Sequence, residues 1–287
     1  MTNKPKILCT GAPRSGTSLF NLLMVYFKDL LVEINGTPSD LFKYTDVFTS
    51  QQRPDGKIWN DFIGGGNKLS FKDILTDKTY LIKGDKEIKL IVIYRDGRDC
   101  FVSARMTRPN ISMEIGATYH SLKTETTYWY TMKEIEKWFN SIKEIHKTIE
   151  AIKDTPLENN FLVVKYEDLV NNPEIEMKRV EDFVGLPLDP DYTKFYEKAN
   201  YRRMLSSPQI MGIGNTIALR EDSSVEGALG SEYIKHRPIA PDSIGRWKKP
   251  IHKERMKEIL SVYGEQLSDM LIELEYETDK KWINELN

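Results

Sequence analysis

A short loop near the start of the chain holds the residues best suited to binding an anion. It reads Gly-Ala-Pro-Arg-Ser-Gly-Thr-Ser from residue 11, and its candidate ligand residues are Arg14, Ser15, Gly16, Thr17 and Ser18. The backbone N–H groups of a glycine loop that opens a helix point at a bound anion, and the helix dipole favours negative charge there. Arginine and hydroxyl side chains add further donors. This combination predicts a phosphate-binding loop, and a tight turn without a ligand is the alternative.

The loop departs from that of nucleoside triphosphatases at one position. Gly11 and Gly16 have the spacing of that phosphate loop, in which the second glycine is followed by lysine and then by serine or threonine. Residue 17 is threonine here, so the lysine that reaches the terminal phosphates is missing. Arg14 supplies a cation from inside the loop instead.

A second polar cluster follows the apolar run of residues 88–94. It reads Arg95-Asp96-Gly97-Arg98-Asp99, with Ser103 a little further on. A magnesium-dependent triphosphatase would place an aspartate directly at that strand end, where this chain has an arginine. Arginine and a hydroxyl together suggest a second phosphate site. The alternative is a salt-bridged helix start, in which the two aspartates pair with the two arginines.

Hydrophobic periodicity predicts the elements that must hold these residues. Short apolar runs predict strands, and near-continuous ones predict burial on both faces of a parallel sheet. These runs cover residues 6–10, 30–34, 88–94 and 161–164. Apolar residues three and four apart predict helices. These are expected after the loop, over 122–152 with the aromatic residues 128–130 on its core face, from Pro173 to Gly185, and over 256–274.

Strands alternating with helices predict an α/β fold. We expect a single domain over residues 1–287, with a central parallel β-sheet flanked by helices, of the P-loop-containing nucleotide-binding type. Residues 35–79 and 201–245 lack periodicity and are expected to be irregular. Long loops in a compact domain are typical of functional or disordered segments.

Composition narrows the range of partners. The 287 residues include 41 Lys and Arg against 43 Asp and Glu, which gives a formal net charge of −2. Bulk binding to nucleic acid or to an anionic membrane needs a cationic excess, so neither is expected. No apolar run has the length of a signal peptide core or a membrane span, and the two cysteines and four histidines lack metal-ligand spacing. A cytoplasmic, metal-free protein is expected.

Four segments, in this order, resemble the signatures of sulfotransferases that use 3′-phosphoadenosine 5′-phosphosulfate (PAPS). They are Pro13-Arg14-Ser15-Gly16-Thr17-Ser18, Tyr94-Arg95-Asp96-Gly97-Arg98-Asp99 with Ser103, Lys165-Tyr166-Glu167-Asp168-Leu169, and Ile244-Gly245-Arg246-Trp247-Lys248. The arginine in the loop is more similar to the carbohydrate- and tyrosine-modifying branches than to the small-phenol branch, which carries lysine there.

The resemblance implies a role for each segment. It places the 5′-phosphosulfate on the loop and its amides, and the 3′-phosphate on Arg95 and Ser103. The segment of residues 244–248 resembles one that closes over the nucleotide, while residues 165–168 support the site from behind. The implied nucleotide-binding residues are Arg14, Ser15, Gly16, Thr17, Ser18, Arg95, Ser103, Arg246, Trp247 and Lys248.

The implied reaction is in-line transfer of a sulfuryl group to a hydroxyl or amine, without magnesium. Arg14 would stabilise the negative charge that builds on the leaving oxygen. Glu33 is the first choice for the general base, because a catalytic glutamate lies in a similar place in the tyrosine-modifying branch. A solvated strand-end carboxylate is its alternative.

Two further residues are candidates for catalysis. His120 is the second choice for the base, because imidazole titrates near neutrality; a surface or helix-start histidine is the alternative. Lys83 resembles a lysine that often precedes the nucleotide strand in the family, although Gly84-Asp85 replaces the usual Thr-Pro or Asp-Pro.

The sequence thus predicts a PAPS-dependent sulfotransferase. Its acceptor would be a small molecule, a carbohydrate or a peptide, and neither the acceptor nor the oligomeric state follows from the sequence. Two alternatives remain: a P-loop small-molecule or nucleoside kinase that uses ATP, and a non-catalytic nucleotide-binding protein.

Overall fold

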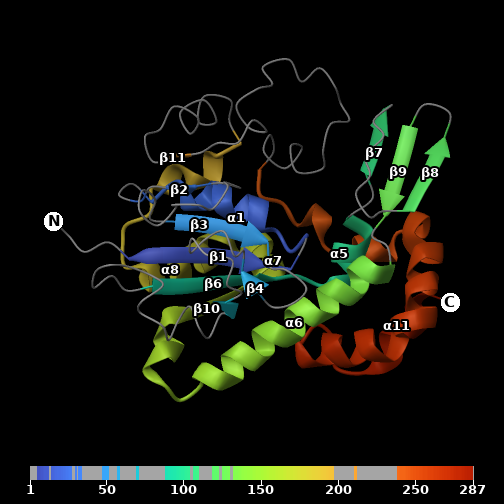
Figure 1. Ribbon diagram of the computed structural model, residues 1–287. Coiled ribbons are helices and arrows are strands. Elements are labelled where there is room, and N and C mark those ends of the chain that lie inside the picture. Colours follow the sequence, from blue (N-terminus) through green and yellow to red (C-terminus); the bar gives the residue numbers. More distant parts are fainter. Residues whose placement is uncertain are drawn as a thin grey trace.

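A six-stranded parallel sheet forms the centre of the protein in the computed structural model (Figure 1). The structure describes residues 5–12, 14–27, 30, 32–33, 47–51, 57–58, 69–70, 88–103, 106–109, 118–122, 125–129, 132–196, 210–211 and 238–286. The strand order is β10-β6-β1-β3-β2-β11, and every pairing in this sheet is parallel. The strands are β1 (Lys6–Gly11), β2 (Val32–Glu33), β3 (Val47–Gln51), β6 (Ile88–Tyr94), β10 (Phe161–Lys165) and β11 (Ile210–Met211). This sheet confirms the predicted α/β fold.

The middle strands are buried on both faces, as their apolar runs predict. On β6, Leu90 and Val92 contribute to one core cluster, whereas Ile91 and Ile93 contribute to the other. The first cluster joins the sheet to α5 (Gly97–Ser103), α6 (Met132–Ile152) and α11 (Lys253–Glu273). The second joins it to α1 (Thr17–Met24), α7 (Tyr166–Asn171) and α8 (Pro173–Val184). Helices therefore cover both faces of the sheet.

Three strand-to-helix connections leave neighbouring strands at one edge of the sheet. They lead from β1 to α1, from β6 to α5 and from β10 to α7. Because parallel strands end at the same edge, these connections bring together the loop of residues 11–18, the Arg95 cluster and residues 165–168. The fold thus gathers three of the four segments singled out in the sequence.

The prediction that residues 35–79 are irregular was wrong in part. β3 lies inside this range and pairs with both β1 and β2, and β4 (Lys57–Ile58) pairs antiparallel with β5 (Leu69–Ser70). The sequence of β3 is Val-Phe-Thr-Ser-Gln, so only its first two residues are apolar. Its place in the sheet is determined by pairing with β1 and β2, and a local apolar pattern does not predict such pairing. The nearby strand expected over 30–34 is shorter, at Val32–Glu33.

The long helix begins later than predicted. α6 starts at Met132, and the residues before it form an antiparallel sheet of order β7-β9-β8. Leu122 ends β8 (Thr118–Leu122), and Trp129 ends β9 (Glu125–Trp129). The expected helical face was therefore wrong for Tyr128 and Trp129, while Tyr130 lies outside the described residues. The third strand is β7 (Met106–Pro109). Cross-strand pairing, such as Tyr119 with Tyr128, replaces the helical spacing there.

The helix predicted near the end of the chain is present, and a further short helix follows it in the sequence. α11 is followed by a 3-10 helix, η7 (Lys280–Leu286). The other 3-10 helices are η2 (Pro156–Asn160), η3 (Pro190–Lys194), η4 (Pro241–Ser243), η5 (Arg246–Lys248) and η6 (Pro250–His252). Among the residues that the structure describes, no helix has the length and apolar character needed to cross a membrane.

Candidate functional site

The loop between β1 and α1 makes a tight turn at the carboxyl edge of the sheet. Ser15 N donates a hydrogen bond to Ala12 O at 3.1 Å. Arg14 and Gly16 both have left-handed backbones, with φ of 70° and 103°. Gly11 leaves no room for a side chain, because a Cβ there would lie 2.5 Å from Ile93 O on the neighbouring strand. A tight turn with left-handed residues directs successive backbone N–H groups into one concavity, which can bind an anion.

Gly16 is the N-cap residue of α1 and packs directly on an aromatic ring. A Cβ at this position would lie 2.3 Å from the Tyr166 side chain. Tyr166 is the first residue of α7 and is buried, and its Oη and Ser243 Oγ form a hydrogen bond of 2.7 Å. The predicted support of the loop from behind is therefore a physical contact from the β10–α7 connection.

Two hydroxyl-bearing residues of the loop are buried. Ser15 is fully buried and Thr17, the first residue of α1, is 5% exposed. Ser15 Oγ has no hydrogen-bond partner among the described residues. A buried hydroxyl without a partner costs about 1–3 kcal/mol, so a ligand oxygen that accepts from it would recover that cost. Ser18 follows in α1.

Arg95 connects the loop to the segment that precedes η5. Its Nη1 donates to Arg14 O at 3.1 Å, and its Nη2 donates to Ser243 O at 2.7 Å. The guanidinium carbon lies 4.5 Å from the centre of the Tyr166 ring, in cation–π geometry. The third guanidinium nitrogen, Nε, is buried and has no hydrogen-bond partner among the described residues. Arg95 thus contacts two segments, and its Nε–H is a donor for a further acceptor.

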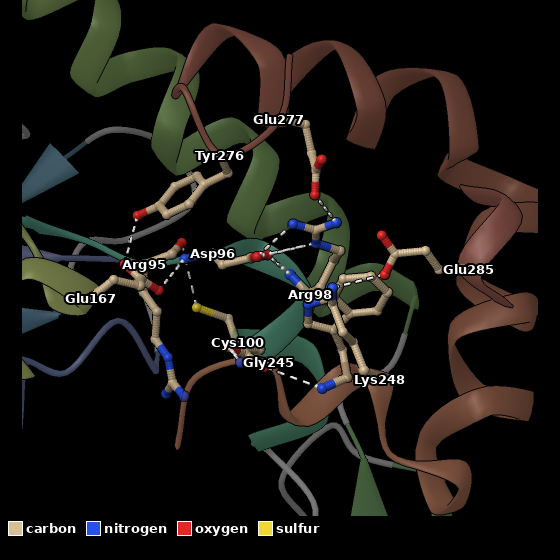
Figure 2. A network of polar contacts seen from close by, with 12 residues as sticks. Arg95, Asp96, Arg98, Cys100, Glu167, Gly245, Lys248, Tyr276, Glu277 and Glu285 are labelled. Carbon is tan, nitrogen blue, oxygen red and sulfur yellow. Dashed lines mark hydrogen bonds and ion pairs between the residues drawn. The ribbon is translucent and has the colours of Figure 1, made fainter. Parts of the chain in front are cut away.

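The alternative of a salt-bridged helix start is correct for one of the two pairs. Asp96 accepts from Arg98 at Nε and at Nη2, the latter at 2.7 Å (Figure 2). Asp99 accepts instead from the backbone of a distant turn, from Gly245 N at 2.7 Å and from Trp247 N at 3.2 Å. Burial raises the pKa of Asp99, although Arg95 and these two N–H groups oppose the shift.

The segment of residues 244–248 lies against α5 through this turn. Trp247 is 2% exposed and belongs to the core cluster on that face of the sheet. Arg246 Nε donates to Asp242 O at 3.3 Å, and Lys248 Nζ forms an ion pair with Glu285 at 2.8 Å. The structure therefore brings the fourth segment to the same edge of the sheet, with its tryptophan inside the protein.

Glu167 joins three parts of the chain behind the strand ends. Its Oε1 accepts from Asp96 N at 3.0 Å, and its Oε2 accepts from Tyr276 Oη at 3.0 Å (Figure 2). Burial raises the pKa of Glu167 to about 7, although the N–H of Asp96 opposes this shift. The supporting role expected for residues 165–168 fits these contacts, but nothing near residue 276 in the sequence identifies a partner more than a hundred positions away.

The structure describes two of the remaining candidates, Glu33 and His120, by their backbones alone. Glu33 ends β2 and is in register with Phe48, which is in register with Leu8 of β1. Leu8 lies three positions before Gly11, so the Glu33 backbone lies about 10 Å short of the loop along the strand direction.

The structure describes the backbone of His120 but does not describe Lys83. His120 is in β8, opposite Thr127, in the small antiparallel sheet that stands apart from β1 and β2 in Figure 1. Lys83 lies outside the described residues, and Ser103 is the last residue of α5. Among the described residues, no group of three or more His, Cys, Asp or Glu side chains could hold a metal ion.

Comparison with known proteins assigns the chain to a family. Residues 78–270 match the family model described as "Sulfotransferase domain". The chain therefore belongs to the sulfotransferase family. Carbohydrate sulfotransferase 2 of mouse and of human are each 43% identical to it over 51 residues, which cover 17% of this chain and 10% of theirs. Protein-tyrosine sulfotransferase A of Caenorhabditis elegans is 23% identical over 286 residues, covering 90% of this chain and 65% of that protein.

Solved sulfotransferase structures are similar over most of the chain. The sulfotransferase domain of a Synechococcus olefin synthase has a TM-score of 0.46 and 13% identity, and covers 91% of this chain and 96% of that domain. A mouse sulfotransferase complexed with PAP has a TM-score of 0.45 and 14% identity, and covers 90% of this chain and 83% of that protein.

Proposed function

We propose that this protein transfers a sulfuryl group from PAPS to a hydroxyl or an amine of a carbohydrate, small-molecule or peptide acceptor. One observation carries the proposal: the loop of residues 11–18 and Arg95 meet at one edge of the sheet, where Arg95 donates to the carbonyl of Arg14. Two anion-directed sites in contact fit a ligand with phosphate groups at both ends. Membership of the sulfotransferase family supports the reaction class.

The residues present fit such a nucleotide. The loop offers the amides at the start of α1, the buried Ser15 hydroxyl and the hydroxyl of Thr17, which would hold the 5′-phosphosulfate. Ser18 is proposed to contribute there as well. Arg95, with its remaining Nε donor, and Ser103 would hold the 3′-phosphate. The segment of Arg246, Trp247 and Lys248 would border the nucleotide on the far side of Arg95.

The proposed chemistry needs little from the protein beyond charge and position. When bound, PAPS supplies an activated sulfuryl group on a phosphate that leaves. The sulfur–oxygen bond to that phosphate breaks as a bond from the acceptor oxygen or nitrogen to sulfur forms, and the acceptor proton passes to a base. Arg14 stabilises the charge on the leaving oxygen. We propose Glu33 as the base, His120 as the second choice and Lys83 as a further cation.

The general base has a direct test. Replacing Glu33 by glutamine should lower the turnover number at saturating PAPS by roughly 10²–10⁴, because the acceptor would lose its proton acceptor. The matched variant is His120→Gln, measured over the same pH range. A rate that stays near wild type in Glu33→Gln at every pH, with a loss in His120→Gln, would assign the base to His120.

Nucleotide binding separates the proposal from a kinase on the same loop. We expect tight binding of adenosine 3′,5′-bisphosphate (PAP), measured by isothermal titration calorimetry, to be unchanged when EDTA replaces magnesium. A preference for magnesium-ATP over PAP would contradict the proposal. The missing lysine at residue 17 and the arginine after β6 are the features that favour PAP.

Turnover separates the proposal from a non-catalytic nucleotide-binding protein. The protein and PAPS should be incubated with a panel of sugars, phenols, alcohols and peptides, and the products analysed by mass spectrometry for the gain of one sulfo group. A product with any acceptor class supports the enzyme and names its substrate. A protein that binds PAP but sulfates none of the panel would support the binding role.

A further inference from the structure

The chain continues past the end of the family match with a segment that contacts the proposed nucleotide site. The match ends at residue 270, and residues 274–286, which we call the strap, follow at the end of α11. Five strap residues contact residues of the three strand-end connections or of η5: Glu275, Tyr276, Glu277, Trp282 and Glu285. Figure 2 shows three of them, Tyr276, Glu277 and Glu285.

Arg98 is the centre of these contacts. Its guanidinium carbon lies 4.1 Å from the ring centre of Trp247 and 4.6 Å from that of Trp282. Glu277 Oε1 forms an ion pair with Nη1 at 2.6 Å, while Asp96 accepts from Nε and Nη2. The Arg98 side chain is only 3% exposed. A buried cation with two carboxylates and two indole faces has few alternative positions.

The same contacts fix the turn that carries η5. Trp247 contacts both Arg98 and Trp282, and the two indole rings meet edge-on at a centroid distance of 5.6 Å. The backbone of this turn is bonded to Asp99 through Gly245 N and Trp247 N. Two residues before Gly245, Ser243 accepts from Arg95 Nη2. The position of Arg95 therefore depends on the turn, and the turn depends on the strap.

We propose that the strap is a positioning device for the nucleotide site, with Trp282 and Glu277 as its positioning residues. They act through Arg98 and Trp247 on the 243–248 turn, and through Ser243 on Arg95, which the proposed function places on the nucleotide. This inference rests on the proposed function for the identity of the ligand. It concerns residues that the family match does not include.

The test compares two strap residues of equal burial. Trp282 and Leu286 are each 3% exposed and belong to the same core cluster. Leu286 has no charged or aromatic group that could hold Arg98. Trp282→Ala should weaken PAP binding roughly three- to thirtyfold, whereas Leu286→Ala should leave it within about twofold at a temperature where both variants are folded. Trp282→Phe, which keeps a ring face for Arg98, should recover most of the affinity.

A second readout does not need the nucleotide. Hydrogen–deuterium exchange of the free protein should be faster in peptides covering residues 243–248 for Trp282→Ala than for Leu286→Ala, and Glu277→Gln should show the same increase to a smaller extent. Peptides covering β1 and β6 should exchange at the wild-type rate. Equal exchange over 243–248 in the two alanine variants would overturn the proposal, as would losses of PAP affinity that follow thermal stability alone.

The two readouts also separate the proposals from each other. If the wild-type protein fails to bind PAP, the proposed function fails, while the exchange comparison still decides whether the strap holds the turn. If the wild type binds PAP and the exchange does not differ between Trp282→Ala and Leu286→Ala, the proposed function stands and the strap is only a stabilising element.

Discussion

Arg14 contributes to the site in two separate ways at the level of the single residue. Its carbonyl, not its side chain, accepts from Arg95, so truncating the side chain leaves that hydrogen bond in place. Its backbone has a φ of 70°, which arginine and alanine tolerate about equally poorly. A substitution by alanine therefore tests the guanidinium alone.

Arg14→Ala should separate catalysis from nucleotide binding. We expect the turnover number to fall by about 10²–10³, because the guanidinium acts on charge that develops only in the transition state. Binding of PAP, measured by calorimetry, should change by less than about fivefold. Arg14→Lys keeps the charge and should retain part of the turnover. Equal losses in turnover and in PAP affinity for Arg14→Ala would mean that the side chain binds the ground state instead.

At this scale the sequence indicates some residues of the candidate site and not others. Ser15, Thr17 and Arg95 could be chosen because a glycine loop and a buried strand end mark where donors gather in a parallel sheet. The role of Asp99 could not, because its partners are backbone N–H groups more than a hundred residues away. Every residue other than proline has such a group, so no side-chain type identifies the partners of Asp99.

At the level of the element, the junction between the loop and α1 depends on the backbone conformation of one residue, Gly16. Gly16 has a φ of 103°, and the ring of Tyr166 occupies the space of a Cβ. Both the left-handed backbone and the ring oppose any side chain there. The start of α1, where the amides face the anion site, is therefore tied to the first turn of α7.

Gly16→Ala should destabilise the protein by about 2–5 kcal/mol, as the sum of backbone strain and overpacking. Urea unfolding followed by circular dichroism measures this change. Gly264→Ala is the matched control, because a Cβ there lies inside α11 and meets only Leu260 at 3.8 Å, so it should gain roughly 0.5–1 kcal/mol. The double variant with Tyr166→Ala should be more stable than the two single effects predict when added. Simple additivity would contradict the proposed clash.

The elements that could be predicted are those with a local signal. β1, β6 and β10 carry apolar runs, and α8 has Pro173 at its start and Gly185 in a left-handed conformation at its end. β3 and the β8–β9 hairpin escaped prediction because pairing between strands decides them. The polar side chains of β3 fit an irregular segment as well as a strand, and the aromatic side chains of β9 fit a helix as well as a strand.

Glu167 links three separate regions at the level of the whole molecule. It lies after β10, accepts from the backbone that follows β6, and accepts from Tyr276 of the strap. Burial raises its pKa to about 7, from an ordinary value near 4.5. The native state therefore keeps a proton on this carboxyl over a pH range in which the unfolded chain has lost it.

The sign of the resulting pH dependence follows from proton counting. Between about pH 4.5 and 7 the native state binds more protons at Glu167 than the unfolded state does, so this group's contribution to the free energy of unfolding falls as pH rises.

Glu167→Gln keeps an oxygen for Asp96 N–H and a polar group for Tyr276, but has no proton to lose. Its stability relative to wild type should therefore increase as pH is raised from 5 to 8, measured by urea unfolding at fixed ionic strength. Glu258→Gln, whose carboxylate pairs with Arg255 and is more than half exposed, serves as the control and should show a much smaller trend, because arginine stays charged over this pH range. If the stabilities of Glu167→Gln and wild type differ by the same amount at every pH, the carboxyl is ionised throughout, and the hydrogen bonds from Asp96 and Tyr276 outweigh its burial.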